Sequence, residues 1–354
     1  MKKLLLATAA FALIAPAAQA EIKLDLGGYF KGYAGYSDQD VSAKKFDLKR
    51  KSQVSFTGET TLDNGLTVGY NGTLFQENNE DGSNVTTGAE VERSYLYFSG
   101  NWGRVNLGRE NGAAYLLQVS APGADANIDG QDIAVSFYNA ENVRQDYKHV
   151  STETQYNDKI TYLTPKFNGF QAGVSYATTD EAKSNSDRFG NAAKNSTEFK
   201  DIMEIAARYD GEFSGVGVHA GAGYSKANND QAAKDFDAYN VGLKFTFDSF
   251  GLGAAYLNED AGTTGTSAYK ARTWTVGGDY TYGAYTFGVN YFNTKNKAAD
   301  ADLDRWTVGA GYTFGPGMKF NGVLGFYNGD NVLNNGTAAN NDATVFTIGT
   351  DIQF

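Results

Sequence analysis

The chain of 354 residues has a formal net charge of −11, no cysteine, 42 glycines, 23 tyrosines, 23 phenylalanines and only 4 prolines. The acidic balance disfavours nucleic acid, whose phosphates select basic proteins, and the lack of cysteine excludes disulfides and thiolate metal sites. Mean hydropathy is low, at −0.43, while 14% of the residues are aromatic, a combination that favours alternating strands over a large apolar core.

The first twenty residues have the pattern of a secretory signal peptide. Lys2 and Lys3 form a basic start, residues 4–16 are apolar, and Ala18 to Ala20 form an A-x-A cleavage site. We therefore predict cleavage before Glu21. Beyond that point, the sequence has no apolar run of the roughly 20 residues that a membrane-spanning helix needs.

Alternation of apolar and polar residues with a period of two dominates the rest of the chain, and this pattern predicts strands. Short connections rich in Gly and Asn alternate with long polar ones, as in an up-and-down antiparallel sheet, and no break in composition divides residues 21–354 into domains. The sixteen predicted strands are 24–37, 52–62, 65–75, 93–101, 103–110, 154–164, 169–178, 201–210, 215–227, 236–247, 250–259, 270–282, 284–294, 304–314, 318–328 and 343–354.

A membrane barrel and a soluble sandwich can both carry this alternation. The predicted export, the contrast between short turns and long loops, and the aromatic strand ends at 95–102 and 280–287 favour the barrel. The fold class we expect is therefore all-β: a 16-stranded antiparallel transmembrane β-barrel. A barrel of this size encloses an aqueous channel, whereas one of about eight strands is filled by side chains.

The segment 111–148 interrupts the alternation and is long for a surface loop. Its apolar parts, 114–119 and 133–137, would be poorly placed in water. We expect this third outer loop to fold inward and constrict the pore; an external loop is the alternative. Its acidic side chains, which we expect at the constriction, are Asp125, Asp129, Asp132 and Glu141.

Basic residues are predicted on the wall opposite that loop. In each strand the residues that alternate with the apolar ones point into the lumen. An acidic loop facing a basic wall would create a transverse field that sorts solutes by charge. The residues assigned to this basic wall are Lys31, Lys49, Lys51, Arg93 and Lys148.

The stretch 125–130 reads D-x-N-x-D-G, the first half of a calcium-binding loop. Asp125, Asn127 and Asp129 would supply the oxygen ligands, but the twelfth position is Ser136 instead of Glu. Calcium is thus a tentative ligand and a turn-forming acidic segment the alternative. No cofactor is expected to be required.

Catalysis is not expected. His149 and Ser151, with Asn157 nearby, have the His-x-Ser spacing of an outer-membrane phospholipase, but that family has fewer strands. We expect His149 to be a polar residue of the wall.

Several stretches together resemble the Gram-negative general diffusion porins, most closely those of the alphaproteobacterial type. They are "VSFTGETTLDNGLTVGY" (54–70), "YFSGNWGRVNLGRE" (97–110), "YNDKITYLTPKFNGFQAGVSYA" (156–177) and the closing "DIQF". The resemblance implies a homotrimer in the outer membrane, in contact with lipid and lipopolysaccharide, with passive diffusion of small hydrophilic solutes and ions. Gln53 and Tyr95 stand where some members have constriction arginines, so selectivity does not carry over. A plugged structural or adhesin-like barrel is the alternative.

The closing strand, 343–354, should pair with the first one, near residues 24–33. Phe346, Ile348, Ile352 and Phe354 would form its lipid-facing side.

Overall fold

The computed structural model describes residues 21–41, 44–78, 90–129, 136–149, 156–179, 199–228, 235–260, 270–334 and 338–354. The predicted signal peptide, 1–20, the acidic residue Asp132 and Ser151 lie outside this part of the chain.

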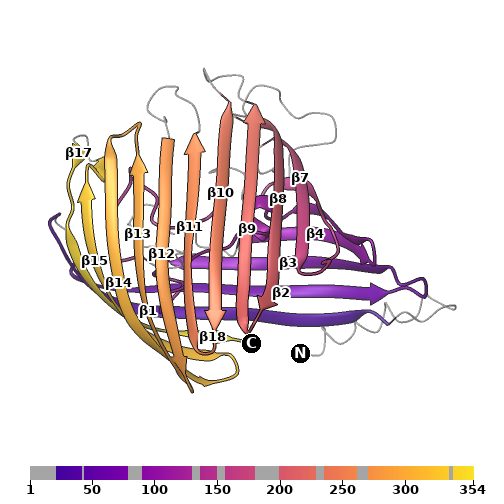
Figure 1. The fold of residues 1–354 in the computed structure, drawn as a ribbon, viewed down its shortest axis with the longest axis horizontal. Helices are drawn as coiled ribbons and strands as arrows, with labels where there is room; N and C mark the ends of the chain where they lie inside the picture. The colour runs from indigo at the N-terminus through magenta and orange to yellow at the C-terminus, as the bar shows by residue number, and fades with distance from the viewer. Residues whose placement is uncertain are drawn as a thin grey trace, which may run out of the picture.

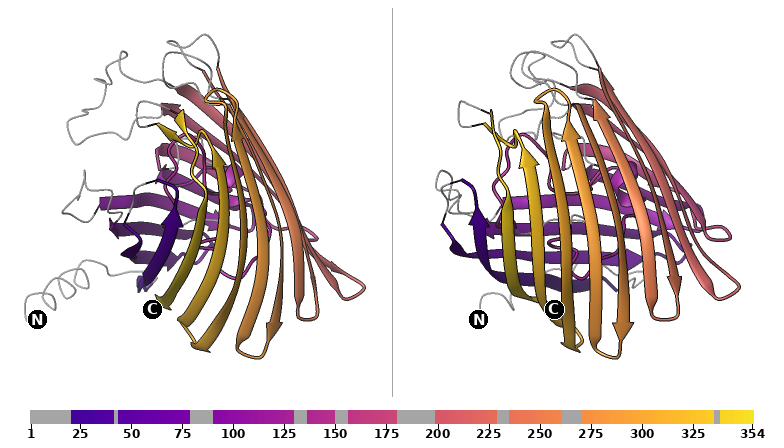
Figure 2. Two further views of the ribbon diagram at one scale, coloured as in Figure 1. Left: turned by 90° about the vertical axis from the view of Figure 1, so that its left-hand side faces the viewer. Right: turned by 60° about the vertical axis from the view of Figure 1, so that its left-hand side comes forward.

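A closed antiparallel barrel of sixteen strands forms the molecule, and each strand pairs with its neighbours in the sequence (Figures 1 and 2). The predicted strand number and order are confirmed. The barrel strands are β1 (Lys23–Gln39), β2 (Phe46–Thr61), β3 (Thr67–Asn78), β4 (Glu90–Gly100), β5 (Gly103–Arg109), β6 (Asp158–Leu163), β7 (Phe170–Thr179), β8 (Lys200–Phe213), β9 (Val216–Asn228), β10 (Phe236–Phe247), β11 (Phe250–Asp260), β12 (Lys270–Tyr282), β13 (Tyr285–Asn296), β14 (Ala301–Gly315), β15 (Met318–Asp330) and β18 (Ala343–Gln353).

The first and last strands close the barrel, as predicted. Tyr29 pairs with Gln353 at one end of this seam, and Gln39 pairs with Ala343 at the other. Backbone hydrogen bonds in both directions between Gly28 and Phe354, at 2.8 and 3.1 Å, extend the pairing to the last residue. The ladder is therefore continuous around the whole circumference.

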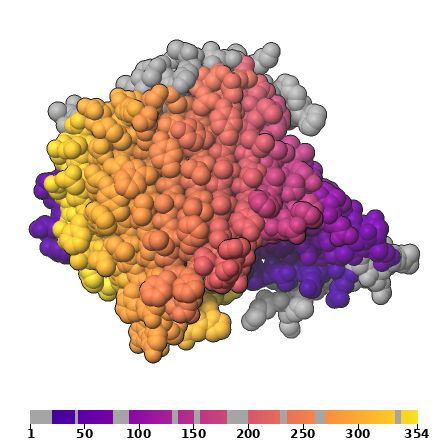
Figure 3. Space-filling model, in the orientation of Figure 1, coloured from indigo at the N-terminus to yellow at the C-terminus, as the bar shows by residue number. Residues whose placement is uncertain are grey.

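The two faces of the sheet differ in chemistry. Large apolar side chains such as Phe30, Val289 and Phe346 are exposed on the outside, while alternate residues such as Thr161 and Thr273 are fully buried on the inside. Figure 3 shows the outer face as one continuous wall from β8 to β15. An apolar exterior around a polar interior is the arrangement of a barrel that stands in lipid.

Short elements that do not belong to the barrel sheet were not predicted. They are the single-turn helix α2 (Ala113–Leu116), which follows β5, and a two-stranded sheet of β16 (Leu333–Asn334) and β17 (Ala338–Ala339). Among the described residues, no helix has the length and apolar character needed to cross a membrane. Short turns join neighbouring strands at one end of the barrel, and Gly65 and Gly317 supply the positive φ, 81° and 79°, that two of these turns use.

Candidate functional site inside the barrel

The chain between β5 and β6 lies against the inner face of the barrel. We call its described residues, 110–129 and 136–149, the inner segment. Wall partners such as Ser175, Glu204 and Thr307 are buried residues of their strands, so the segment lies inside the barrel. Four of its hydrogen bonds to the wall join Ala113 N to Ser175 Oγ on β7 (2.8 Å), Ala114 N to Glu204 Oε2 on β8 (3.0 Å), Pro122 O to Asn290 Nδ2 on β13 (3.2 Å) and Asp129 Oδ1 to Thr307 Oγ1 on β14 (2.7 Å).

Tyr33 on β1 is the centre of a buried network where the inner segment crosses the seam between β1 and β18. The Tyr33 hydroxyl lies 2.9 Å from both Asp125 Oδ2 and Asp351 Oδ1, and it accepts a hydrogen bond from Asn127 Nδ2 at 2.9 Å. Lys31 donates to Asn127 Oδ1. These contacts fasten the middle of the inner segment to the closing strands of the barrel.

Asp125 and Asp129, which the sequence places at the constriction, lie on the inner segment and are buried against the wall. Asp125 is only 2% exposed and Asp129 only 1%. Asp129 Oδ2 accepts the backbone N–H of Asp125 at 2.7 Å, so the two acids also organise their own turn. Burial raises the pKa of both carboxyl groups, that of Asp129 to about 6. These acids hold the segment against the wall because the wall supplies hydrogen-bond donors at that position.

The same contacts do not fit a calcium ion at Asp125, Asn127 and Asp129. Asp125 Oδ1 accepts from both nitrogens of Asn127, at 3.0 Å from the backbone and 2.7 Å from the amide. The carboxylate oxygens of Asp129 are likewise turned toward donors, and the Lys31 ammonium contacts Asn127 Oδ1. Calcium needs six to eight oxygen ligands with open lone pairs. The described residues hold no group of three or more acidic or histidine side chains arranged for a metal.

Four of the five residues of the predicted basic wall lie on β1, β2 and β4, and they form two pairs that differ in what they contact. Lys31 and Lys49 both reach the inner segment: Lys49 Nζ donates to Ser136 O at 2.5 Å and lies 5.4 Å from the centre of the Phe137 ring. Lys51 instead lies 4.8 Å from the Phe75 ring centre on the neighbouring strand. Arg93 Nε lies 3.8 Å from Glu92 Oε2 on the same strand. Two of the four wall cations therefore secure the inner segment.

The remaining predicted constriction residues are on the returning half of the inner segment. Lys148 lies 3.6 Å from Asp146. Glu141 is exposed, and its backbone N–H donates to Val332 O at 2.8 Å. The transverse field between an acidic loop and a basic wall thus lacks two of its expected acids, while the charge at Asp132 stays a prediction.

The returning half contacts the wall from β15 back to β9. Tyr138 stacks on Tyr327 with ring centres 4.5 Å apart. Arg144 Nη1 and Glu259 Oε1 form an ion pair at 2.5 Å, and the Glu259 side chain is 1% exposed. Glu259 was not predicted from the sequence. Its only sign there is that a charged residue occupies a position of β11 that points inward.

Arg305 on β14 was also missed. It is fully buried, donates from Nη1 to Gln145 O at 3.0 Å, and has its guanidinium 4.4 Å from the centre of the Phe292 ring. Its only sign in the sequence is likewise that it occupies a position of its strand that points inward.

His149 ends the inner segment in a buried network. One ring nitrogen, Nε2, lies 2.5 Å from Ser225 Oγ, and the other, Nδ1, lies 2.6 Å from Asn240 Nδ2. Burial, together with the charge of Arg144, lowers the pKa of His149 to about 3, so the imidazole is neutral. Asn157 is engaged elsewhere, donating to Thr179 O at 3.2 Å.

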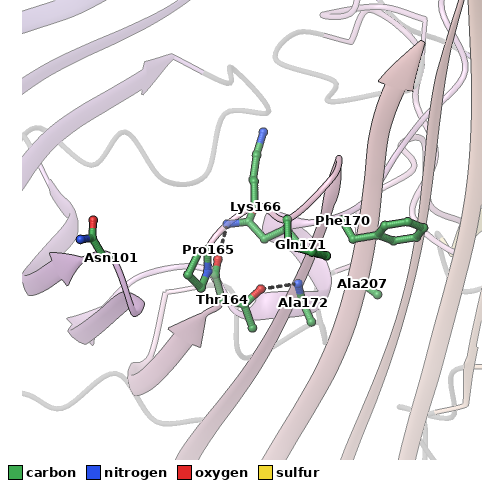
Figure 4. A pocket seen from close by; sticks show the side chains of 9 residues that line it. Asn101, Thr164, Pro165, Lys166, Phe170, Gln171, Ala172 and Ala207 are labelled. Carbon is green, nitrogen blue, oxygen red and sulfur yellow. Dashed lines mark hydrogen bonds between the residues drawn. The ribbon is translucent and has the colours of Figure 1, made fainter. Parts of the chain in front are cut away.

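A separate cavity of about 540 Å³ lies at the short-turn end of the barrel (Figure 4). Its lining includes Lys166 and Phe170 from the β6–β7 hairpin and Asn101 from the β4–β5 turn, and Thr164 Oγ1 accepts the Ala172 N–H at 2.9 Å within it. The inner segment contributes no lining residue, so this cavity is distinct from the constriction.

Comparison with known proteins gives consistent results. A family model for Gram-negative porins matches residues 7–332. The chain is 26% identical to an outer-membrane porin protein of Bordetella pertussis over 332 residues, covering 84% of this chain and 79% of that protein. It is also 26% identical to a porin of Fuscovulum blasticum over 327 residues, covering 86% of this chain and 96% of that one.

Solved structures show the same fold. An anion-selective porin from Comamonas acidovorans superimposes with a TM-score of 0.66 at 17% identity, over 94% of this chain and 100% of that one. An outer-membrane protein of Vibrio cholerae in a trimer form gives a TM-score of 0.62 at 15% identity, over 94% of this chain and 99% of that one.

Proposed function

Because the chain belongs to the Gram-negative porin family, and so forms a channel for passive diffusion across the outer membrane, we propose that small hydrophilic solutes and ions pass between its inner segment and the wall around Lys51 on β2 and Arg93 on β4. The observation that carries this proposal is the closed sixteen-stranded barrel with a polar inner face. A barrel of that strand number leaves room for water along its axis. The inner segment occupies one side of this space and narrows the passage.

Charge at the passage comes from residues on both sides of it. Lys51 and Arg93 stand on the wall, beside Phe75 and Glu92, and Arg144, Asp146 and Lys148 alternate along the returning half of the inner segment. Such fixed charges in a narrow aqueous space bias which ions enter. We propose that Lys51 and Arg93 favour anions at the narrowest part.

No catalytic step is proposed. His149 and Ser225 have the atoms of a nucleophile and a base, but both residues are buried, at 1% and 0% exposure, and the acceptor nitrogen of the imidazole faces the amide of Asn240. A hydrolytic pair must reach its substrate. This network is better suited to holding the end of the inner segment.

A homotrimer is proposed as the assembled form, in contact with lipid and lipopolysaccharide. The Vibrio cholerae protein of the same fold, solved in a trimer form, supports this assembly. The exposed apolar outer face also requires a cover of lipid or protein. Chemical cross-linking of the folded protein in detergent should give a ladder that ends at three chains.

Conductance across a planar bilayer tests the channel. Folded protein should insert as stable, ohmic steps, grouped in threes for a trimer. Folded protein that gives no conductance would contradict the proposal and support the plugged barrel. Deleting residues 111–148 separates these cases, since the deletion would enlarge an existing conductance in a channel and create a new one in a plugged barrel.

A further inference from the structure

The inner face of the barrel carries glycine on each of six adjacent strands, at the level where the inner segment crosses them. Strand pairing places these glycines in three directly opposed pairs, Gly221 with Gly242, Gly253 with Gly277, and Gly288 with Gly309. From one pair to the next the row steps by two residues along the strand, because Gly242 pairs with Ala255 and Gly277 with Asn290. The row crosses β9 to β14. Its members are Gly221, Gly242, Gly253, Gly277, Gly288 and Gly309, which we call the glycine row.

Backbone atoms of the inner segment occupy the places where side chains of the glycine row would be. A Cβ added at Gly242 would stand 1.8 Å from Val119 O, and one at Gly277 would stand 2.0 Å from Pro122 O. These neighbours are main-chain atoms, which cannot turn aside as the end of a flexible side chain can. The inner segment therefore lies in a groove that only glycine leaves open.

Two further members of the row show the same approach. A Cβ at Gly221 would meet Leu117 O at 2.6 Å, and one at Gly288 would meet Ala124 N at 2.3 Å. The main-chain contact is thus repeated at four of the six glycines, whereas at Gly253 and Gly309 the nearest inner-segment atoms are side-chain carbons, Pro122 Cδ and Ala124 Cβ, each 3.0 Å from the added Cβ.

The ends of this crossing are fixed to the wall. Ala114 N is bonded to Glu204 before it, and Asp129 Oδ1 is bonded to Thr307 after it. Within the crossing, Lys319 Nζ donates to Ala124 O at 3.2 Å. The wall lies on one side of the inner segment. If a side chain fills the space at the glycine row while Ala114 and Asp129 stay bonded, the segment between them can move only toward the axis of the barrel.

We propose that the glycine row sets the width of the channel, by letting the inner segment lie a side chain's depth closer to the wall than it otherwise could. The inference rests on the proposed channel function and adds the residues that position the constriction. These glycines are positioning residues, which act through the segment and not through contact with solute.

The displacement expected from one added methyl group follows from the geometry. Ordinary contact with a Cβ begins at 3.4 Å, so Val119 O must move from 1.8 Å by at least 1.6 Å in Gly242→Ala. Pro122 O must move by at least 1.4 Å, from 2.0 Å, in Gly277→Ala. Both shifts narrow the passage.

Single-channel recording of Gly242→Ala and Gly277→Ala tests the proposal, with Gly58→Ala as the matched control. Gly58 lies on β2, and a Cβ added there would meet nothing within 4 Å. We expect a lower unitary conductance, and a smaller sugar-exclusion limit in liposome swelling, for both row variants, with wild-type values for the control. Unchanged or increased conductance in the row variants would overturn the proposal.

Two features keep the test decisive. Only inserted channels are recorded, so unfolded protein does not enter the comparison. If Gly242→Ala and Gly277→Ala fail to insert, the milder Gly221→Ala takes their place under the same criteria, because the three atoms nearest to its added Cβ all belong to the inner segment and the closest, Leu117 O, is 2.6 Å away. The wild-type conductance tests the channel itself, so failure of the channel and failure of the glycine row give different results.

Discussion

The ion pair between Arg144 and Glu259 should contribute to stability far more than an exposed pair of similar length. Replacing Arg144 by Met keeps the length and apolar stem of the side chain but leaves the Glu259 carboxylate without its 2.5 Å partner. Glu259 is 1% exposed, so water does not replace the lost donor. Breaking a buried pair in this way costs about 3–5 kcal/mol.

The pair between Lys45 and Asp38 provides the control. Its nitrogen–oxygen distance is 2.8 Å, but the two side chains are 63% and 61% exposed. Exposed pairs contribute about 0–1 kcal/mol because water and salt screen them. Lys45→Met should therefore change the free energy of unfolding by a small fraction of the Arg144→Met effect.

Guanidinium unfolding of the folded barrel in detergent micelles measures both variants. The double variant Arg144→Met with Glu259→Leu should recover most of the lost stability, because it removes the unpaired charge as well as its partner. The reasoning fails if Arg144→Met costs no more than Lys45→Met, or if the double variant is as unstable as the single one.

Three further changes test the inner segment and the wall that faces it. Tyr33→Phe removes the hydroxyl that joins Asp125 to the seam, and should cost about 1–3 kcal/mol by the same unfolding assay; no loss would exclude this network as an anchor. Burial raises the pKa of Asp129 to about 6 from 3.8, so its stabilising contribution is complete below pH 3.8 and is lost as the pH rises through 6. Asp129→Asn should abolish that part of the pH dependence, and an unchanged profile would contradict the assignment. Neutralising Lys51 and Arg93 together should shift the reversal potential in a salt gradient toward cations; a constant potential would remove both residues from the selectivity site.

Much of the barrel could be predicted because alternation is a local property of the sequence. All sixteen strands occur in the predicted order, but several begin earlier than predicted, and β2, β4 and β14 do so by three residues or more. β2 starts at Phe46, before the predicted position 52, because Arg50 occupies one of the outward-facing positions and interrupts the apolar pattern there. β14 starts at Ala301, before position 304, where Asp302 takes the outward parity. Both differences occur where polar residues replace apolar ones on the outward parity of a strand.

The interior was predictable only in outline. Length and apolar content identified residues 111–148 as unusual. Their partners could not be read, because Asp125 meets Tyr33, and Arg144 meets Glu259, across long stretches of sequence. Burial of a carboxylate depends on such distant donors, so the sequence alone placed Asp125 and Asp129 at the constriction without identifying the wall residues that bind them.

The seam between β1 and β18 also constrains how the molecule can form. Tyr29 pairs with Gln353, which lies nearly the whole length of the chain away. The sheet is therefore completed by contacts between residues that are very far apart in the sequence. Until β18 docks, β1 and β15 each keep a row of unpaired N–H and C=O groups, which are templates for wrong association. Closing so large a loop is slow, because its entropy is lost before any new contact forms. The growing sheet must therefore be protected until its last strand arrives, and a chain interrupted anywhere before β18 would remain an open, aggregation-prone sheet.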